Sequence, residues 1–332
     1  MRLSVRAPAR ANLIGNPSDL YGGTVIACTV ACHAHAVFSD APALTVATGG
    51  ESIAITSAAD LALRGDVFDI ARAAFAAEPD PFALRLRIDF ETRIPFGSGI
   101  AGSTALLTAM LRGLAAWREE TPSPYELAEQ VRRTEREALG VACGWVDSYL
   151  CSFGGLRCVD LRGKECAFAT PGAPFATVED LAPFVPSLPF VLGFTGIAHH
   201  SGSVHAPIRA RWEQRDPVVV RGYERVAAIA REGKTALLRA DWPQLGALMN
   251  ENHAIQRDFG GSGEPNEKLI EAALRAGALG AKLAGAGGGG TIVALWPDAD
   301  AAPLERALRS AGASELYRPV PVAGVTVQLE NE

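Results

Sequence analysis

Residues 95–108 read Pro-Phe-Gly-Ser-Gly-Ile-Ala-Gly-Ser-Thr-Ala-Leu-Leu-Thr, a glycine-rich loop that runs directly into an apolar repeat. Apolar side chains recur at helical spacing from Leu107 to Trp117, which predicts a helix that begins near Ser103. Such a loop presents unpaired backbone N–H groups and the positive end of a helix dipole, an arrangement that binds phosphate. A glycine-rich turn before a helix can also be simple punctuation, so the loop alone leaves both interpretations open.

The composition is that of an ordinary globular protein, with 332 residues, 48% hydrophobic and 20% charged. This length allows two domains with separate cores. The net charge of -6 and the lack of any basic run argue against nucleic acid as a partner. No segment approaches the ~18 apolar residues of a membrane span, and the first six residues lack the apolar run of a signal peptide. We therefore expect a cytoplasmic protein with no membrane partner.

The cysteines and histidines do not form a metal-binding pattern. Apolar surroundings and the lack of C-x-x-C pairs predict reduced, buried thiols rather than a zinc site. His199 and His200 are adjacent, but nothing in the sequence supplies the other ligands of a metal centre. The six cysteines are Cys28, Cys32, Cys143, Cys151, Cys158 and Cys166.

The order of predicted elements indicates an α+β protein. Residues 84–91 alternate apolar and polar side chains, which predicts a half-exposed strand that enters the glycine loop at Pro95. Ser123-Pro124-Tyr125-Glu126 predicts a capping box that opens a helix through about Leu139. Prolines between 171 and 189 indicate a boundary, so we expect an N-terminal domain over 1–176 and a C-terminal domain over 186–332. Further strands are expected at 155–162, 190–196, 291–296 and 325–330, and helices at 218–229, 235–239, 244–259 and 266–276. We expect Asn266 to cap the last of these helices. The strand at 325–330 is expected to complete the second half.

A second motif lies near the N-terminus, at residues 6–23, between two apolar segments. Its polar side chains offer the paired donors and acceptors that buried sugar hydroxyls require. A polar turn whose side chains cap their own backbone is the structural alternative. The polar residues of this motif are Arg10, Asn12, Asn16, Ser18 and Asp19.

A third motif, residues 281–291, reads Ala-Lys-Leu-Ala-Gly-Ala-Gly-Gly-Gly-Gly-Thr. Its glycines permit a close approach of the backbone to a ligand or to another backbone. A flexible linker is the alternative, but the segment joins two regular elements directly.

These three motifs, in this order and at this spacing, resemble those of the GHMP kinase superfamily, which includes galactokinase, homoserine kinase, mevalonate kinase and phosphomevalonate kinase. The matching segments are residues 6–27, 95–108 and 281–295, and the resemblance covers nearly the whole chain. It implies a two-domain fold with an N-terminal domain like the second domain of ribosomal protein S5 and a ferredoxin-like C-terminal domain. It also implies ATP and Mg²⁺ as cofactors, bound between the domains.

The resemblance assigns both glycine segments to the nucleotide. The loop departs from the family pattern at Gly102, which stands where a serine is usual and leaves the Mg²⁺ shell open to question. Thr104 could compensate for this serine. The implied nucleotide contacts are Pro95, Gly97, Ser98, Gly99, Ala101, Gly102, Ser103 and Thr104, with Gly285, Gly287 and Gly288.

The resemblance also implies the catalytic and metal-binding residues. Asp147 matches the catalytic aspartate, which orients or deprotonates the attacking hydroxyl. Arg10 matches the basic residue beside the moving phosphoryl group. Ser103 and Glu135 match the Mg²⁺ ligands. Glu137, two residues beyond Glu135, is interpreted as a solvated helix charge.

Two further segments narrow the choice of substrate. Asn16-Pro17-Ser18-Asp19 replaces the Glu-His-Thr-Asp of galactokinases, which disfavours galactose. With residues 202–212, it resembles the glucuronokinase branch, whose sugar acid needs a cation for its carboxylate. The substrate contacts expected from this resemblance are Asn16, Ser18, Asp19, His205 and Arg209, with Arg211 as a further candidate.

The sequence therefore predicts an ATP-dependent kinase that acts on a small sugar or sugar acid, most simply the anomeric 1-OH of D-glucuronate, to give glucuronate 1-phosphate. The alternatives within the enzyme class are another sugar-1-kinase of the galactose, fucose or heptose type and a mevalonate-type kinase. A catalytically silent binding protein with the GHMP fold is the alternative from a different class.

Overall fold

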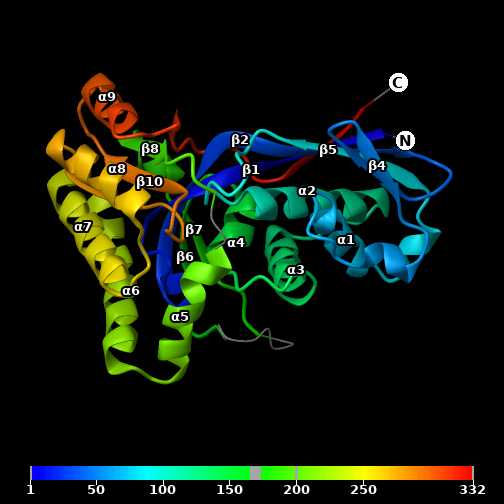
Figure 1. Ribbon diagram of the computed structural model, residues 1–332, viewed down its shortest axis with the longest axis horizontal. Helices are drawn as coiled ribbons and strands as arrows, with labels where there is room; N and C mark the ends of the chain where they lie inside the picture. The colour runs from blue at the N-terminus through cyan, green and yellow to red at the C-terminus, as the bar shows by residue number, and fades with distance from the viewer. Residues whose placement is uncertain (1, 165–172, 199–200, 331–332) are drawn as a thin grey trace.

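The computed structural model describes residues 2–164, 173–198 and 201–330. Figure 1 shows a broad sheet with helices on one face and a second, smaller sheet with its own helices at the other end of the molecule. Strands and helices are thus grouped rather than alternated, which confirms the α+β class. His199, His200 and Cys166 lie outside the described residues.

The larger sheet has the order β12-β1-β2-β5-β3-β4, with β6 paired to β2 and β7 to β6. Its pairs are antiparallel except β3 with β5. The long strand β2 carries both branches, because its first residues pair with β6 and its last with β5. The strands are β1 (Arg2–Ile14), β2 (Thr24–Asp40), β3 (Thr45–Thr48), β4 (Glu51–Ala54), β5 (Leu86–Thr92), β6 (Leu156–Asp160), β7 (Thr177–Asp180) and β12 (Thr326–Leu329).

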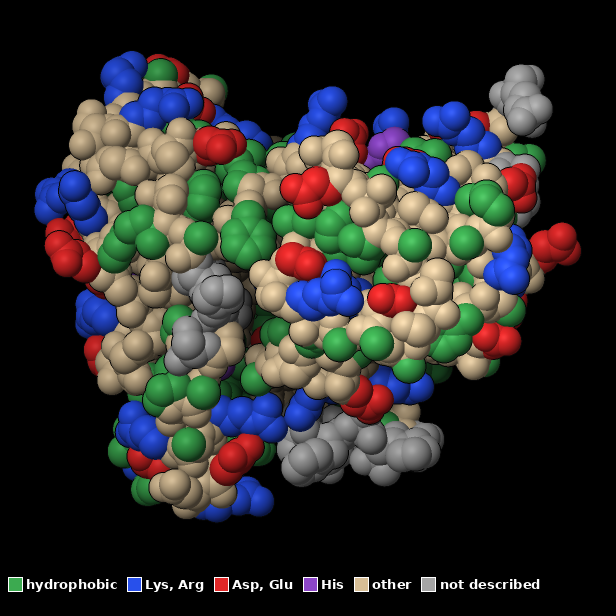
Figure 2. Space-filling view, turned by 45° about the vertical axis from the view of Figure 1, so that its right-hand side comes forward, with side chains coloured by type: hydrophobic (Ala, Val, Ile, Leu, Met, Phe, Trp, Pro, Cys, Tyr) green, Lys and Arg blue, Asp and Glu red, His purple; other side chains and the backbone are tan. Residues whose placement is uncertain are grey.

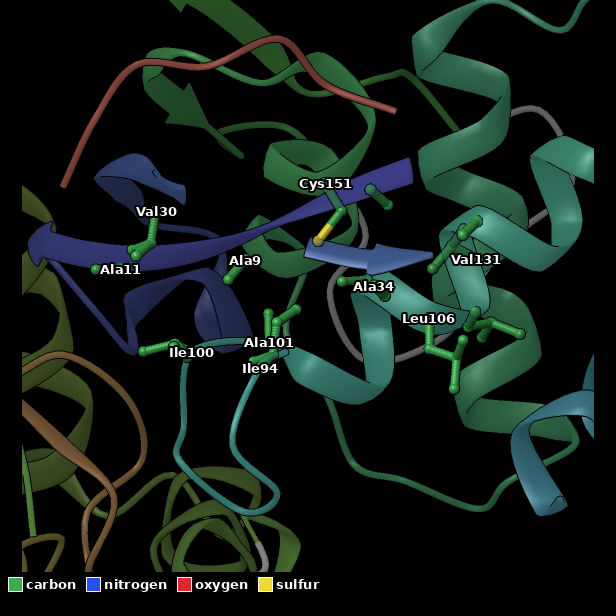
Figure 3. Close-up of a cluster of buried hydrophobic side chains, with 14 of the residues drawn as sticks. Ala9, Ala11, Val30, Ala34, Ile94, Ile100, Ala101, Leu106, Val131 and Cys151 are labelled. Atoms are coloured by element: carbon green, nitrogen blue, oxygen red, sulfur yellow. The ribbon is translucent and has the colours of Figure 1, made fainter. Parts of the chain in front are cut away.

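Helices cover one face of this sheet and bury its apolar side chains (Figure 1). The helix α2 packs across β1 and β2, and Figure 3 shows why it can approach closely: small residues such as Ala9 and Ala34 of the strands face Ala101 and Leu106. This packing brings the loop before α2 against β1. The helices are α1 (Asp69–Ala76), α2 (Gly102–Trp117), α3 (Pro124–Glu137) and α4 (Val146–Phe153), with short 3-10 turns η1 (Ser18–Tyr21), η2 (Ala58–Leu61), η3 (Pro81–Ala83) and η4 (Ala182–Phe184).

The smaller sheet is antiparallel and has the order β11-β8-β10-β9. Its buried strands form a second core with α8 and α9. Among the described residues, no helix has both the length and the apolar character needed to cross a lipid bilayer. The elements are β8 (Phe190–Phe194), β9 (Gly280–Leu283), β10 (Thr291–Leu295), β11 (Glu315–Tyr317), α5 (Ser201–Glu213), α6 (Pro217–Leu238), α7 (Trp242–Asp258), α8 (Glu264–Arg275) and α9 (Ala302–Ser310).

Most of the local predictions hold, and three are wrong. The capping box at Ser123 is confirmed. The residues 235–239 do not form a separate helix, because α6 continues through them. Asn266 is not a cap: Gly263 holds that position and Asn266 lies inside α8. The last strand, β12, does not complete the second half, because it pairs with β1 of the larger sheet.

The prediction of buried thiols is confirmed for three of the described cysteines and is wrong for Cys32 and Cys143, which are half-buried. The five described cysteines are free thiols, and Cys28, Cys151 and Cys158 are buried. Burial raises the pKa of Cys28 to about 12, so this thiol is unreactive at neutral pH.

Candidate active site

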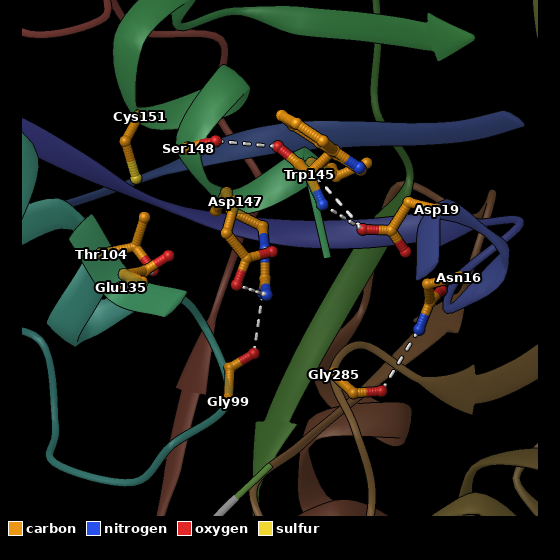
Figure 4. A network of polar contacts seen from close by, with 12 residues as sticks. Asn16, Asp19, Gly99, Thr104, Glu135, Trp145, Asp147, Ser148, Cys151 and Gly285 are labelled. Carbon is orange, nitrogen blue, oxygen red and sulfur yellow. Dashed lines mark hydrogen bonds and ion pairs between the residues drawn. The ribbon is translucent and has the colours of Figure 1, made fainter. Parts of the chain in front are cut away.

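The two predicted catalytic residues meet between β1 and the first turn of α4. Arg10 Nε donates to Asp147 Oδ1 at 2.7 Å, and Nη2 donates to Oδ2 at 2.6 Å (Figure 4). The Arg10 side chain is 6% exposed and that of Asp147 26% exposed. Such a two-point contact fixes the plane of the carboxylate while leaving it open to a ligand.

The same arginine holds the glycine-rich loop, residues 95–101, which we call the phosphate loop after its predicted role. Arg10 Nη1 donates to Gly99 O at 2.8 Å, and its backbone N–H donates to Ile100 O at 3.0 Å. From the other side, the Thr291 hydroxyl donates to Ser98 O at 2.8 Å. The loop is therefore held by both sheets. Gly97 and Gly99 have positive φ angles of 63° and 73°, as does Ala101 at 67° just before α2.

Gly285 belongs to the support of this loop rather than to its open side. A Cβ at Gly285 would lie 2.7 Å from Gly99 O, so only glycine permits this approach of one loop to the other. The predicted contact of Gly285 with nucleotide stays a prediction, and the structure adds a packing reason for the glycine.

Among the remaining glycines of the third motif, Gly289 is held by Asn266. Its side chain accepts from Gly289 N at 2.7 Å and donates to Gly289 O at 2.8 Å. A Cβ at Gly287 would lie 1.9 Å from Gly261 O, so this glycine also serves a close backbone approach. Gly288, in contrast, is exposed and free to approach a ligand. Asn266 therefore holds Gly289 instead of capping α8 as predicted.

Glu135 provides a buried carboxylate next to the phosphate loop. The Thr104 hydroxyl donates to Glu135 Oε1 at 2.6 Å, while Oε2 is buried and has no hydrogen-bond partner in the described part of the chain. Burial raises the pKa of Glu135 to about 7. Thr104 therefore positions Glu135, and its predicted compensation for the serine that is absent at Gly102 stays a prediction.

These residues fit a divalent cation only if a ligand completes the site. The unpartnered oxygen of Glu135 is a hard donor of the kind that Mg²⁺ prefers, and Ser103 is exposed at the first turn of α2. Among the described residues, however, no three His, Cys, Asp or Glu side chains gather into a metal site. Phosphate oxygens would have to supply further ligands, as is usual for Mg²⁺ at nucleotide sites.

Gly102 has a local structural reason. A Cβ at this position would lie 3.1 Å from Ile94 Cγ2, tighter than ordinary contact. Ile94 is buried beside Ala101, so it cannot move freely (Figure 3). The absence of a serine at position 102 is thus linked to the packing of Ile94, where the chain enters the loop.

Asp19 caps the helix that carries Asp147. Its Oδ2 accepts from Trp145 N at 2.9 Å and from Val146 N at 3.2 Å (Figure 4). A Cβ at Gly144 would lie 2.0 Å from this oxygen, so a glycine must precede the helix here. Burial, and next the charge of Asp147, raise the pKa of Asp19. A substrate contact by Asp19 stays a prediction, beside the structural role that its hydrogen bonds show.

Asn16 joins the two sheets rather than facing open space. Its Nδ2 donates to Leu283 O at 3.4 Å and to Gly285 O at 3.2 Å, and its Oδ1 accepts from Lys282 Nζ at 2.5 Å. The side chain is buried and its polar atoms are all engaged. This differs from the predicted substrate contact, because Asn16 would have to exchange these partners to bind a ligand.

Ser18 also differs from its predicted role. It is fully buried, and its hydroxyl donates to Thr24 O at 3.1 Å. The hydroxyl thus caps the turn of its own motif, which was the structural alternative for this segment.

Lys282 and Asn252 are the residues whose roles the sequence did not reveal. Asn252, in α7, accepts from Gly15 N at 2.9 Å and donates to Asn16 O at 3.1 Å. Lys282, in β9, is 1% exposed, and burial lowers its pKa to about 7. A lysine between two apolar residues of a buried strand was the available signal for such a role.

The helix α5 places its predicted substrate residues unequally. His205 is buried, and Arg209 Nε donates to Glu213 Oε1 at 2.8 Å. The charges of Arg209 and Asp19 both act on the Tyr21 hydroxyl, so the arginine lies near the N-terminal motif, residues 6–23. Arg211 instead pairs with Asp216. His205 and Arg209 stay candidates for substrate binding, and Arg209 is the better placed arginine.

Two protein-family models match the chain. The model described as the GHMP kinases N terminal domain matches residues 61–155, and the one described as GHMP kinases C terminal matches residues 234–314. Together they span just over half of the chain, one on each side of the predicted boundary.

Curated proteins and solved structures agree with these matches. The chain is 27% identical to the mevalonate kinase of Pyrococcus furiosus, over 99% of each chain. It is 28% identical to glucuronokinase 1 of Arabidopsis thaliana, over 71% of this chain and 64% of that protein. Its fold is similar to that of Lactococcus lactis galactokinase complexed with galactose, with a TM-score of 0.77, 18% identity, and coverage of 98% of this chain and 95% of that one.

Proposed function

Because the chain belongs to the GHMP kinase family, and is therefore an ATP-dependent phosphotransferase that acts on an alcohol, we propose that its acceptor is a small hydroxy carboxylic acid. The two-point contact of Arg10 with Asp147, beside Gly99 of the phosphate loop, is the observation that carries the catalytic part of this proposal. ATP and Mg²⁺ are the expected co-substrate and cofactor.

Asp147 serves the attacking hydroxyl. Each of its oxygens accepts one hydrogen bond from Arg10 and keeps lone pairs for a second donor. A carboxylate held in this way orients the substrate hydroxyl and accepts its proton as the phosphoryl group is transferred.

Arg10 serves both the base and the phosphoryl group. The guanidinium has five N–H donors, of which Asp147 and Gly99 take three, so each terminal nitrogen keeps one for a phosphoryl oxygen. Because the arginine is buried, its charge acts at low effective dielectric on the developing negative charge.

Ser103 and Glu135 would hold Mg²⁺ at the start of α2. When bound, the ion supplies charge neutralisation between the phosphates. Thr104 orients Glu135 by its hydrogen bond, and the backbone N–H groups at the start of α2 face the phosphates.

The curated relatives suggest two acceptors, mevalonate and glucuronate, and both carry a carboxylate. Similarity over the full length favours mevalonate over the glucuronate expected from the sequence motifs. Glucuronate keeps the sequence resemblance over residues 16–19 and 202–212, although Asn16 and Ser18 use their polar atoms within the protein. Mevalonate and glucuronate are both hydroxy acids, and Arg209 is the cation that we assign to the carboxylate.

A coupled assay of ADP release tests this proposal with mevalonate, glucuronate, galacturonate, galactose, mannose and a heptose phosphate as acceptors. We expect turnover with mevalonate or glucuronate and a KM for the acid that rises at least about tenfold in Arg209→Ala. Turnover confined to neutral sugars would reject the hydroxy-acid assignment. Arg215→Ala, which removes an arginine just beyond the same helix, is the matched control.

A further inference from the structure

The larger sheet carries a hollow on the face opposite its helices. Along β5 and the second half of β2, buried apolar side chains alternate with more exposed ones, and the helices cover the buried side of these strands (Figure 1 shows the helices on one face of the sheet). In Figure 2, histidine lies among basic side chains along the upper edge of the molecule. The hollow is a cavity of about 180 Å³, lined by Arg6, Ala31, His33, His35, Glu91 and Arg93.

Strand register gathers these residues. Arg6 lies directly opposite His35, and His35 lies opposite Glu91, so the three form one row across β1, β2 and β5. The Arg93 backbone N–H donates to His33 O at 3.2 Å and adds a second row beside the first. Three strands thus contribute to one site.

An irregularity in β2 hollows the sheet at this point. The pairing of β1 with β2 shifts between Pro8 and Ala9, so that residues 31 and 32 of β2 have no partner on β1. A bulge of this kind bends the strand and opens its surface. The exposed residue at the bulge is Ala31, whose small side chain leaves the space free.

The lining carries a net positive charge, because Arg6 and Arg93 stand against the one carboxylate of Glu91. Burial, and next the charge of Arg6, lower the pKa of His33, so this ring is neutral at pH 7. No carboxylate within the described residues forms an ion pair with Arg6 or Arg93. Glu91 is the acid of the lining, and its Oε1 lies 3.7 Å from His35 Nδ1. His35 Nε2 is within 2.8 Å of Ser4 Oγ. This positive site is a local exception in a chain with a net charge of -6.

We propose that this hollow binds a phosphoryl dianion, either inorganic phosphate or the phosphate end of a small monoester. A carboxylate can be satisfied by one arginine fork, whereas a phosphoryl group offers oxygens to donors that approach from several directions. Arg6 and Arg93 approach from different strands, with His33 and His35 between them. This site is separate from the phosphate loop, which lies on the helix-bearing side.

Isothermal titration of inorganic phosphate tests the site, with the full chain saturated with ADP and Mg²⁺ so that the phosphate loop is filled. We expect one phosphate to bind per chain. In Arg6→Ala/Arg93→Ala the affinity should fall at least about tenfold, because two charge-assisted contacts are lost. Both arginines are exposed, so the variant keeps the fold, which its thermal unfolding checks.

Arg2→Ala is the matched control, since Arg2 is an exposed arginine of the same strand that pairs with Glu330 outside the hollow. Its affinity for phosphate should equal that of the wild type. Equal affinity in the double variant, or no phosphate binding to the wild type, would overturn the proposal. Titration with methyl phosphate separates the two sources: equal binding indicates a monoester, and binding of inorganic phosphate alone indicates the free ion.

Discussion

At the scale of single residues, the chemistry depends on a carboxylate that is held at two points and still open to solvent. Arg10 is buried and donates to both oxygens of Asp147 as well as to the phosphate loop. One side chain, Arg10, therefore positions the predicted base Asp147 and the phosphate loop, and itself supplies the positive charge between them. Removal of the carboxylate charge should separate catalysis from nucleotide binding.

We predict that Asp147→Asn lowers kcat about 10²–10⁴-fold, because the amide cannot accept the proton of the substrate hydroxyl. ATP affinity should be retained, since Asp147 is not part of the phosphate loop. The coupled ADP assay and calorimetric titration of ATP measure the two quantities. Glu137→Gln, an exposed acid of α3, serves as control and should leave kcat unchanged. Undiminished kcat in Asp147→Asn would refute the assignment.

At the scale of elements, the start of α4 depends on Asp19. Its Oδ2 accepts from the backbone N–H groups of Trp145, the N-cap residue, and of Val146, the first residue of the helix, both within two residues of Asp147. The hydrogen bonds of Asp19 that cap α4 thus lie next to Asp147, the predicted catalytic residue. The sequence motif that contains Asp19 is 126 residues away, so no local pattern reveals this cap.

We predict that Asp19→Ala lowers the free energy of unfolding by about 1–2 kcal/mol, because the cap is lost. Asp19→Asn should retain most of the stability, since the amide oxygen still accepts and no charge is buried. Urea denaturation of both variants measures this difference. Should Asp19 act on the substrate alone, Asp19→Ala would raise KM and leave stability unchanged.

The start of α2 depends on the contact between Gly102 and Ile94. We predict that Gly102→Ser costs about 1 kcal/mol or more of stability, because the new Cβ crowds Ile94 Cγ2. Ile94→Leu has the same volume without the branch at Cβ, so Ile94→Leu/Gly102→Ser should regain stability relative to Gly102→Ser. Thermal unfolding of the single and double variants provides the measurement. Additive effects of the two substitutions would show that the contact is not responsible.

At the scale of the whole molecule, the two sheets are joined by a buried polar cluster. Asn16 of the first motif, Lys282 of β9 and Asn252 of α7 hydrogen-bond across this junction. The lysine is the costly member, because burial lowers its pKa to about 7 from the ordinary 10.5.

We predict that the stability of the wild type rises relative to Lys282→Met between pH 7 and 10. The unfolded chain holds the lysine proton up to about pH 10.5, whereas the folded chain releases it from about pH 7. Above pH 7 the unfolded state binds more protons, so deprotonation favours folding by at most about 1.4 kcal/mol per pH unit. Urea denaturation at pH 7, 8 and 9 checks the slope. Parallel profiles would contradict it.

Local patterns predicted elements better than partners. The alternation at residues 84–91 and the capping box at Ser123 depend on neighbours in the chain, and both elements form. The strand at 325–330 was also recognisable, but its place was not, because β12 pairs with β1 at the other end of the chain. Asn266 is of a residue type that often caps helices, yet its side chain hydrogen-bonds to Gly289 of a distant loop.

By itself, the sequence determined the α+β class, the family and the three glycine-containing motifs, and it predicted Arg10 and Asp147 as the catalytic pair. Residue type and spacing along the chain suffice for these. Only the tertiary structure decided that Asp19 caps α4, that Asn16 and Lys282 join the sheets, and that the glycine at 102 accommodates Ile94. Those roles come from hydrogen bonds and packing between residues far apart in sequence, whose approach depends on how helices and sheets pack.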